Sequence, residues 1–204
     1  MPFDHDGDDA VDLTVLVVTY NHAAFIEQTL DSVLAQETDR TVEIIISEDA
    51  STDATTKIVK AFAAREPRAR LLLSPHNLHS NEVVARGIRS ARGRYLCLLD
   101  GDDYWTSPSK LEDQAALMDR HPGVSAWFHN AVVCRPDGES RERWTPASQP
   151  AVLADGLIWH GNPFATCAGM LRMSALRGLG TWYDDFSPMI TDWPLYVLCA
   201  EHGE

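Results

Sequence analysis

Residues 13–22 read LTVLVVTYNH, and this stretch indicates the fold more clearly than any other. Every residue from Leu13 to Thr19 is apolar or β-branched, which is typical of a strand buried within a parallel sheet. Polar Tyr20, Asn21 and His22 then end the strand, and residues 23–35 place apolar side chains at helical spacing. The stretch therefore predicts a buried strand, a polar turn and a helix.

The same pattern recurs along the first half of the chain. Strands are expected at 42–47, 69–73 and 94–99, with helices at 52–65 and 82–91 between them. Strands that alternate with helices predict an α/β fold with a doubly wound, mostly parallel sheet.

The second half of the chain has weaker periodicity. A capping serine and a first-turn proline, Ser107 and Pro108, predict a helix that ends at residues 121–123. Further elements are expected as strands at 124–133 and 166–172, a turn at 135–138 and a helix at 194–202. Residues 141–155 are polar and interrupted by proline, and we expect a mobile or substrate-covering segment there. Because the chain ends at Glu204 just after a short helix, we expect it to stop before its second half is complete.

The composition limits the possible partners and compartments. Seventeen Lys and Arg against 30 Asp and Glu give a net charge of -13, which disfavours nucleic acid and anionic lipid. No apolar run approaches the roughly 18 residues that cross a bilayer, so we expect at most peripheral membrane contact. The four cysteines lack the spacing of a zinc site and the density of a secreted disulfide scaffold, which indicates reduced, mostly buried thiols in the cytoplasm. The length favours one domain, residues 13–204, behind an acidic tail at 1–12.

Polar and acidic residues follow three of the predicted strands. Thr19 to Asn21 follow the first, Glu48 and Asp49 the second, and Asp100 to Asp103 the strand at 94–99. Ligands of open parallel sheets bind beyond the carboxyl ends of the strands, so these groups are expected to meet at one edge. Clustered carboxylates repel one another unless a cation lies among them. Oxygen ligands suit Mg²⁺ or Mn²⁺, which bind few carboxylates together with substrate phosphates.

Each acidic group also has a structural interpretation. The run at 100–103 can be a solvated loop that precedes the next helix. Ser51 or Asp53 can cap the helix expected from residue 52, and for Asp53 we favour this structural role. The spacing of Asp49, Ser51 and Asp53 also matches the start of a calcium loop, but Ala54 and Lys60 replace its required glycine and glutamate.

Three stretches together resemble the family 2 glycosyltransferases of the GT-A fold. They are residues 15–21 (VLVVTYN), 44–53 (IIISEDASTD) and 93–103 (GRYLCLLDGDD), and the resemblance continues from Leu13 to the end of the chain. The resemblance implies a Rossmann-like nucleotide-binding half at about 13–105 and an acceptor half at about 106–204.

The resemblance also implies roles for individual residues around a bound donor. Thr19, Tyr20 and Asn21 would line the nucleotide base, and Asp49 would accept a hydrogen bond from a uracil-type ring. Asp100 would lie near the ribose. Asp102 would ligate the Mg²⁺ or Mn²⁺ that bridges the diphosphate, and the resemblance leaves Asp103 undecided. The segment before residue 93 departs from the family pattern, which argues against a diphosphate contact by Arg86.

The late segment Thr191-Asp192-Trp193 resembles the acidic-aromatic motif whose aspartate is the catalytic base. From the residues alone, Asp192 is equally an N-cap for a helix that opens with Trp193 and Pro194, and the two roles are compatible. Asp184 and Asp185 are the competing candidates for the base. Four aromatic residues are candidates for stacking on sugars, although packing explains at least half of them: Tyr104, Trp105, Trp159 and Trp182.

These implications predict an inverting, metal-dependent glycosyltransferase of cell-surface polysaccharide or glycoconjugate synthesis. Its donor would be a UDP- or dTDP-type sugar, and its acceptor a saccharide, a lipid-linked molecule or a small molecule. The expected place is the cytoplasm or the inner face of the membrane. One alternative is a non-catalytic nucleotide-sugar-binding module that needs a partner or a further C-terminal region. Another is a nucleotidyltransferase, although the chain lacks an early glycine-rich, lysine-bearing phosphate loop.

Overall fold

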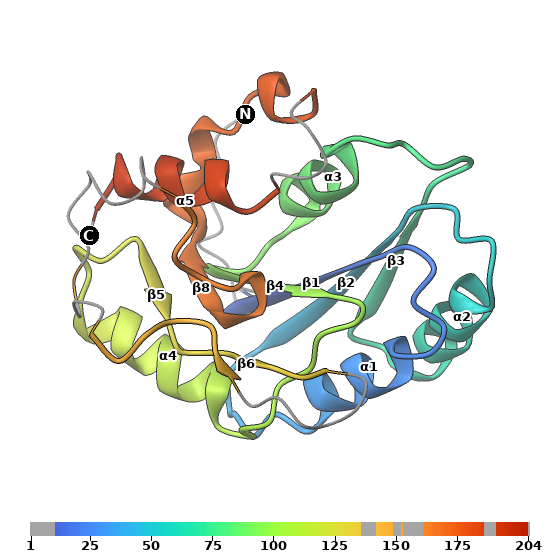
Figure 1. Cartoon of the computed structure of the whole chain (residues 1–204), viewed down its shortest axis with the longest axis horizontal. Coiled ribbons are helices and arrows are strands. Elements are labelled where there is room, and N and C mark those ends of the chain that lie inside the picture. Colours follow the sequence, from blue (N-terminus) through green and yellow to red (C-terminus); the bar gives the residue numbers. More distant parts are fainter. Residues whose placement is uncertain (1–10, 136–141, 149–151, 153–160, 186–190, 204) are drawn as a thin grey trace.

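The computed structural model describes residues 11–135, 142–148, 152, 161–185 and 191–203. Its main sheet has six strands in the order β3-β2-β1-β4-β8-β5 (Figure 1). Four of them are parallel: β1 (Leu13–Thr19), β2 (Val42–Glu48), β3 (Ala69–Leu73) and β4 (Tyr95–Asp100). Strand β8 (Gly169–Arg172) runs antiparallel to both β4 and β5 (Ala126–Phe128). The predicted α/β fold with a mostly parallel sheet is therefore confirmed.

Helices cover both faces of the sheet (Figure 1). One face carries α1 (Ile26–Leu34), α2 (Thr55–Arg65) and α4 (Lys110–Arg120), and the other carries α3 (Glu82–Ser90) and α5 (Trp193–Ala200). Successive strand side chains point to opposite faces, so Val15 and Val17 pack with the first group of helices while Leu16 packs with the second. Burial on both faces explains the nearly continuous apolar sequence of β1. None of the described helices is long and apolar enough to cross a bilayer.

The strand predicted at 124–133 is wrong as a single element. Strand β5 ends at Phe128, and a separate β6 (Val132–Val133) pairs with β7 (Glu142–Arg143) in a two-stranded ribbon. Asn130 causes the break, because its side chain donates to Thr145 O at 2.7 Å and accepts from Thr145 N at 3.0 Å. These hydrogen bonds hold the chain beside residue 145 and away from the main sheet.

Several predicted boundaries also move. The strand expected at 166–172 begins with the 3₁₀ turn η2 (Thr166–Ala168) and becomes β8 only at Gly169. Helix α4 starts at Lys110 because Ser107 O and Pro108 O accept hydrogen bonds from the chain after α1. Helix α2 starts at Thr55 and not at residue 52.

Three further expectations concern residues at or beyond the limits of the described ranges. Asp12 was expected in the tail, but its carboxylate accepts from Thr41 N at 2.9 Å and so belongs to the fold. The turn expected at 135–138 and Trp159 lie outside the described residues, except for Arg135. Of the segment at 141–155, residues 142–148 and 152 are described.

All four cysteines are free thiols, and all but Cys134 are buried.

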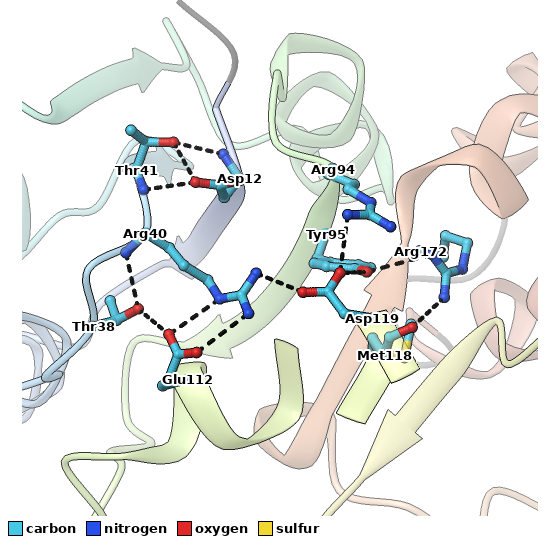
Figure 2. Close-up of polar contacts among 10 residues, drawn as sticks. All are labelled: Asp12, Thr38, Arg40, Thr41, Arg94, Tyr95, Glu112, Met118, Asp119 and Arg172. Carbon is cyan, nitrogen blue, oxygen red and sulfur yellow. Dashed lines mark hydrogen bonds and ion pairs between the residues drawn. The ribbon is translucent and has the colours of Figure 1, made fainter. Parts of the chain in front are cut away.

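A network of charged groups fastens α4 to the edge where the parallel strands begin. Figure 2 shows the Asp119 carboxylate between Arg40 and Arg94, at 2.8 and 2.9 Å, with the Tyr95 hydroxyl donating to it at 2.7 Å. Arg172 donates to Met118 O at 2.9 Å, near the end of α4, where carbonyl groups lack helical partners. The opposite edge of the sheet is thereby left for the loops that follow the strands.

Candidate functional site

The carboxyl ends of β1, β2 and β4 lie level with one another. The register pairs Thr19 with Glu48 on one side and Val18 with Asp100 on the other. The polar residues that follow each strand therefore emerge side by side at one edge, as the sequence predicted. This edge is the candidate site.

The turn after β4 packs directly on the turn after β1. Gly101 N donates to Val18 O at 2.9 Å, and Gly101 O accepts from the Thr29 hydroxyl at 2.9 Å. A Cβ atom on Gly101 would lie 2.5 Å from Thr19 Oγ1 and 2.6 Å from His22 Nδ1. Real Cβ atoms do not approach so closely, so only glycine permits this contact between the two turns.

The three acidic residues around Gly101 differ in environment. Asp102 is exposed over about half of its side chain (52%), and its Oδ2 lies 4.0 Å from His22 Nε2. Asp100 is half-buried, and burial together with the carboxylates of Asp103, Asp102 and Asp192 raises its pKa to about 7. Burial also raises the pKa of Asp103, against a hydrogen bond from the Cys167 thiol. Asp102 is therefore the carboxylate of this turn that is most open to a ligand from solvent.

The residues expected to line a nucleotide base are not equally available. Thr19 is buried, with its hydroxyl 3.3 Å from His22 Nδ1, and Tyr20 is exposed. Asn21 adopts a left-handed backbone (φ 56°), and its Oδ1 accepts from Thr52 N at 2.8 Å. Asn21 thus links the turn after β1 to the turn after β2, and both Tyr20 and Asn21 are exposed.

The acidic residues after β2 are held by backbone groups. Asp49 is buried, and its Oδ1 accepts from the Ser74 hydroxyl at 2.8 Å and from Leu78 N at 3.0 Å. Asp53 accepts from Thr55 N at 2.9 Å and from Ala23 N at 3.0 Å. Asp53 therefore has a structural role, although Ala54 and not Asp53 is the N-cap residue of α2, and Asp49 anchors the loop after β3.

Arg86 is bound by groups of the protein itself. Its guanidinium donates to Ser47 Oγ at 2.9 Å, to Glu48 O at 2.9 Å and to Leu72 O at 3.0 Å. Burial lowers its pKa. Arg86 therefore joins α3 to the ends of β2 and β3.

Asp192 stands at the start of α5. It is the N-cap residue, as predicted from the residues alone, and its Oδ1 accepts from Trp193 N at 2.8 Å. Its Oδ2 accepts from Asn162 Nδ2 at 2.7 Å and from the Thr166 hydroxyl at 3.0 Å. Thr166 links Asp192 to the chain after β4, because the next residue, Cys167, accepts from Trp105 Nε1 at 2.9 Å, and the Asp192 charge helps to raise the pKa of Asp100.

The competing acids have other surroundings. Asp184 is bound by Arg89 through two hydrogen bonds, of 2.8 and 3.0 Å. Asp185 is exposed. Of the three candidates for the base, Asp192 is the one whose charge acts on the acidic turn.

The aromatic residues divide between packing and exposure. Trp105 is buried, its Nε1 donates to Cys167 O at 2.9 Å, and the Lys110 ammonium lies 4.0 Å from the centre of its ring. Its role is therefore packing. Tyr104 and Trp182 are exposed.

The donor set of the acidic turn fits Mg²⁺ or Mn²⁺. Within the described ranges, no three His, Cys, Asp or Glu side chains form a ready-made metal site. Mg²⁺ and Mn²⁺ need fewer, since they typically take one or two carboxylates and complete their coordination with phosphate oxygens and water. The exposed Asp102 with Asp100 and Asp103 behind it, all oxygen donors, matches that requirement.

The sequence did not point to four of the residues that shape this edge: His22, Asn162, Thr166 and Cys167. The sequence places His22 in the turn that follows β1, and that place is the signal that could have identified it. The other three lie in or near η2, where no periodicity marks a position.

Comparison with known proteins identifies relatives along most of the chain. The family model described as Glycosyl transferase family 2 matches residues 14–180. The uncharacterized protein Rv1520 of Mycobacterium tuberculosis is 35% identical over 195 residues, which are 94% of this chain and 55% of that protein. The putative teichuronic acid biosynthesis glycosyltransferase TuaG of Bacillus subtilis is 32% identical, with coverage of 93% and 78%. The chain thus spans about half the length of some of these relatives.

Solved structures of glycosyltransferases share the fold. TarS 1–349 of S. aureus superposes with a TM-score of 0.69 at 18% identity, over 94% of this chain and 55% of that one. The mannosyltransferase PcManGT of Pyrobaculum calidifontis, solved with GDP-Man and Mn²⁺, gives a TM-score of 0.61 at 24% identity, over 85% and 49%. The predicted GT-A type of fold is confirmed by these neighbours.

Proposed function

This chain belongs to glycosyl transferase family 2, and we propose that it transfers a sugar from a nucleoside diphosphate to a hydroxyl acceptor, with inversion. The proposal rests on Asp100 and Asp102 at the carboxyl end of β4 and on Asp192, whose Oδ2 accepts from Thr166, next to the Cys167 carbonyl that binds Trp105 after β4. Binding of the donor would use Asp100 and Asp102. Activation of the acceptor hydroxyl needs a base on the other side of the sugar, and Asp192 would be that base.

The proposed donor is a UDP- or dTDP-type sugar. TarS has been solved with UDP and with UDP-GlcNAc, which supports a uridine nucleotide. Thr19, Tyr20 and Asn21 would line the base, and Asp49 would accept from its ring while anchoring the loop after β3. Asp100 would lie near the ribose.

Asp102 is the proposed metal ligand, because it is the most exposed carboxylate of the acidic turn. Bound Mg²⁺ or Mn²⁺ would supply Lewis-acid stabilisation of the leaving nucleoside diphosphate. The half-buried Asp100 and Asp103 add negative charge behind Asp102, which favours a cation at this position.

Asp192 is the proposed base. It would take the proton of the acceptor hydroxyl as that oxygen attacks the anomeric carbon from the face opposite the leaving group. Helix α5 holds the carboxylate in a defined orientation through the N-cap hydrogen bond to Trp193 N.

The proposed setting is the synthesis of a cell-surface polysaccharide or glycoconjugate at the cytoplasmic side of the membrane. Relatives named for teichuronic acid and succinoglycan biosynthesis support it: TuaG and, at 34% identity over 69% of this chain, ExoO of Rhizobium meliloti. The acceptor would be a saccharide, a lipid-linked molecule or a small molecule.

Calorimetric titration with UDP tests the donor site. UDP should bind in Mn²⁺ and bind much more weakly in EDTA, and Asp102→Ala should remove the difference between the two conditions. Asp31→Ala serves as control, because Asp31 is an exposed carboxylate on α1 outside the site. If neither UDP, dTDP nor GDP binds in Mn²⁺, the proposed function is wrong.

Hydrolysis of UDP-GlcNAc, UDP-glucose and GDP-mannose, with water as acceptor, then tests catalysis. Turnover that disappears in Asp192→Asn while UDP binding persists supports an enzyme with Asp192 as its base. UDP binding without turnover of any sugar would instead indicate a non-catalytic binding module.

A further inference from the structure

The Asp192 carboxylate is held asymmetrically by its surroundings. Oδ2 accepts two hydrogen bonds, from Asn162 Nδ2 at 2.7 Å and from Thr166 Oγ1 at 3.0 Å, whereas Oδ1 accepts one, from Trp193 N at 2.8 Å. A carboxylate oxygen offers about two lone-pair positions. Those of Oδ2 are therefore filled, whereas Trp193 N is the one backbone donor that the described residues supply to Oδ1. The buried Tyr196 hydroxyl lies close enough for the Asp192 carboxylate to help raise its pKa.

Asn162 is itself held in the orientation that donates to Asp192. Its Oδ1 accepts from Phe164 N at 3.1 Å, which directs its NH₂ group toward the carboxylate. Phe164 in turn stacks on Phe128, with ring centroids 3.8 Å apart and an interplanar angle of 4°. The donor thus rests on a packed aromatic pair, and not on a free loop.

Thr166 is held equally well. It begins η2, where the carbonyl of the next residue, Cys167, accepts from the buried Trp105 Nε1 at 2.9 Å. The Thr166 hydroxyl is thereby fixed relative to β4 and the acidic turn that follows it.

The described titratable groups whose charges act with that of Asp192 are acids. They are Asp100 from β4, Tyr183 from the 3₁₀ turn η4 (Thr181–Tyr183) and Tyr196 from α5. None of the ion pairs among the described residues includes Asp192. Neutral hydrogen-bond donors, and not a cation, therefore stabilise its negative charge.

We propose that Asn162 and Thr166 are positioning residues that saturate Oδ2 of Asp192 and so make Oδ1 the atom that receives the acceptor's proton. The inference rests on the proposed function. In the step, the acceptor O–H bond breaks and its proton goes to Oδ1 while the acceptor oxygen bonds to the anomeric carbon. The bond from that carbon to the diphosphate oxygen breaks, and its electron pair leaves with the nucleoside diphosphate.

Matched substitutions separate the hydrogen bond from the shape of the side chain. Thr166→Val keeps the branched shape and removes the donor, whereas Thr166→Ser keeps the donor. Asn162→Asp keeps the acceptor for Phe164 N but puts a carboxylate in place of the NH₂ donor. A carboxylate that loses a donor binds its proton more tightly, so these variants act on the charge state of Asp192.

Carboxyl ¹³C NMR of the aspartates gives a readout that needs no substrate, with Asp192→Asn used to assign the signal. In Thr166→Val the titration midpoint of Asp192 should move up by about one pH unit, and in Asn162→Asp it should move further. Thr166→Ser should return it to the position seen in the unmodified protein. Titration unchanged in both Thr166→Val and Asn162→Asp would overturn the inference.

Hydrolysis of the UDP sugar that turns over provides the second readout. In Thr166→Val we expect kcat to fall roughly ten- to hundredfold at pH 6.5, with UDP affinity unchanged and the acidic limb of the pH profile shifted upward. A purely structural role would lower kcat without shifting that limb. If Asp192→Asn retains full turnover, the proposed base is wrong. If turnover requires Asp192 but ignores Thr166 and Asn162, only this inference is wrong.

Discussion

His22 Nε2 lies 4.0 Å from the Oδ2 atom of Asp102, so a residue of the turn after β1 contacts the exposed carboxylate of the turn after β4. The other ring nitrogen of His22 lies 3.3 Å from the Thr19 hydroxyl. The two turns therefore form one packed unit, and a change that separates them should disturb the donor site.

Gly101→Ala tests this packing. The added methyl group would lie 2.5 Å from Thr19 Oγ1 and 2.8 Å from Thr19 Cβ, so the turns must separate. We expect a loss of about 1–3 kcal/mol in the free energy of unfolding and at least a tenfold loss of UDP affinity in Mn²⁺. Gly123→Ala is the control, since its Cβ would meet nothing within 4 Å. Equal behaviour of the two variants in denaturation and calorimetry would contradict the prediction.

The raised pKa of Asp100 predicts a dependence of stability on pH. A carboxyl whose pKa is about 7 in the folded protein and near 3.8 when unfolded is more readily protonated in the fold. Its contribution to stability is complete at low pH and is lost as the pH rises through about 7. In EDTA, unfolding experiments from pH 5 to pH 8 should therefore show a loss on the order of 1–3 kcal/mol, discounted for partial exposure. Asp100→Asn should lose less unfolding free energy between pH 5 and pH 8. If its unfolding free energy falls with pH as steeply as that of the unmodified protein, Asp100 is not the group responsible.

The conformation of Asn21 in the turn after β1 should affect both stability and nucleotide binding. Its left-handed backbone and its acceptor for Thr52 N are both lost in Asn21→Ala, which should cost about 1–3 kcal/mol of stability and weaken UDP binding. Asn21→Asp retains the acceptor and should lose little stability. Asn21→Gly adopts the left-handed backbone easily but lacks the acceptor, so its stability should lie between those of Asn21→Ala and Asn21→Asp. Thermal denaturation of the three variants measures this order, and Asn21→Gly would be at least as stable as Asn21→Asp if the hydrogen bond had no role.

Asp119 predicts a contribution to stability that is independent of the site. The Tyr95 hydroxyl, followed by Arg40, lowers the pKa of its carboxyl, so its contribution is present above the unfolded value near 3.9 and is lost as the pH falls through the folded value. Asp119→Ala should cost about 1–3 kcal/mol at pH 7, because it removes the acceptor of the buried Tyr95 hydroxyl. Nucleotide binding should not change. Asp31→Ala on α1 is again the control and should stay within about 0.5 kcal/mol of the unmodified protein.

Much of the first half of the fold was predictable, because the relevant signals are local. Residues 13–22 show a buried strand and its end directly, and the strand predicted at 69–73 matches β3. The break at Asn130 was not predictable, since its hydrogen-bond partner, Thr145, is 15 residues away and carries no pattern of its own. The start of α4 was misplaced for the same reason, because contacts from the chain after α1 occupy Ser107 O and Pro108 O.

The sequence by itself determined the parallel sheet, the edge at which the acidic residues meet and the family to which the chain belongs. Periodicity, strand ends and motifs are properties of contiguous residues, so they can be read without coordinates. Only the tertiary structure decided the surroundings of each carboxylate. Exposure separates Asp102 from Asp100, two hydrogen bonds from Arg89 set Asp184 apart, and Asn162 and Thr166 both donate to one oxygen of Asp192. Burial and hydrogen bonding depend on segments distant in the chain, and these act on a carboxylate only once the fold has brought them together.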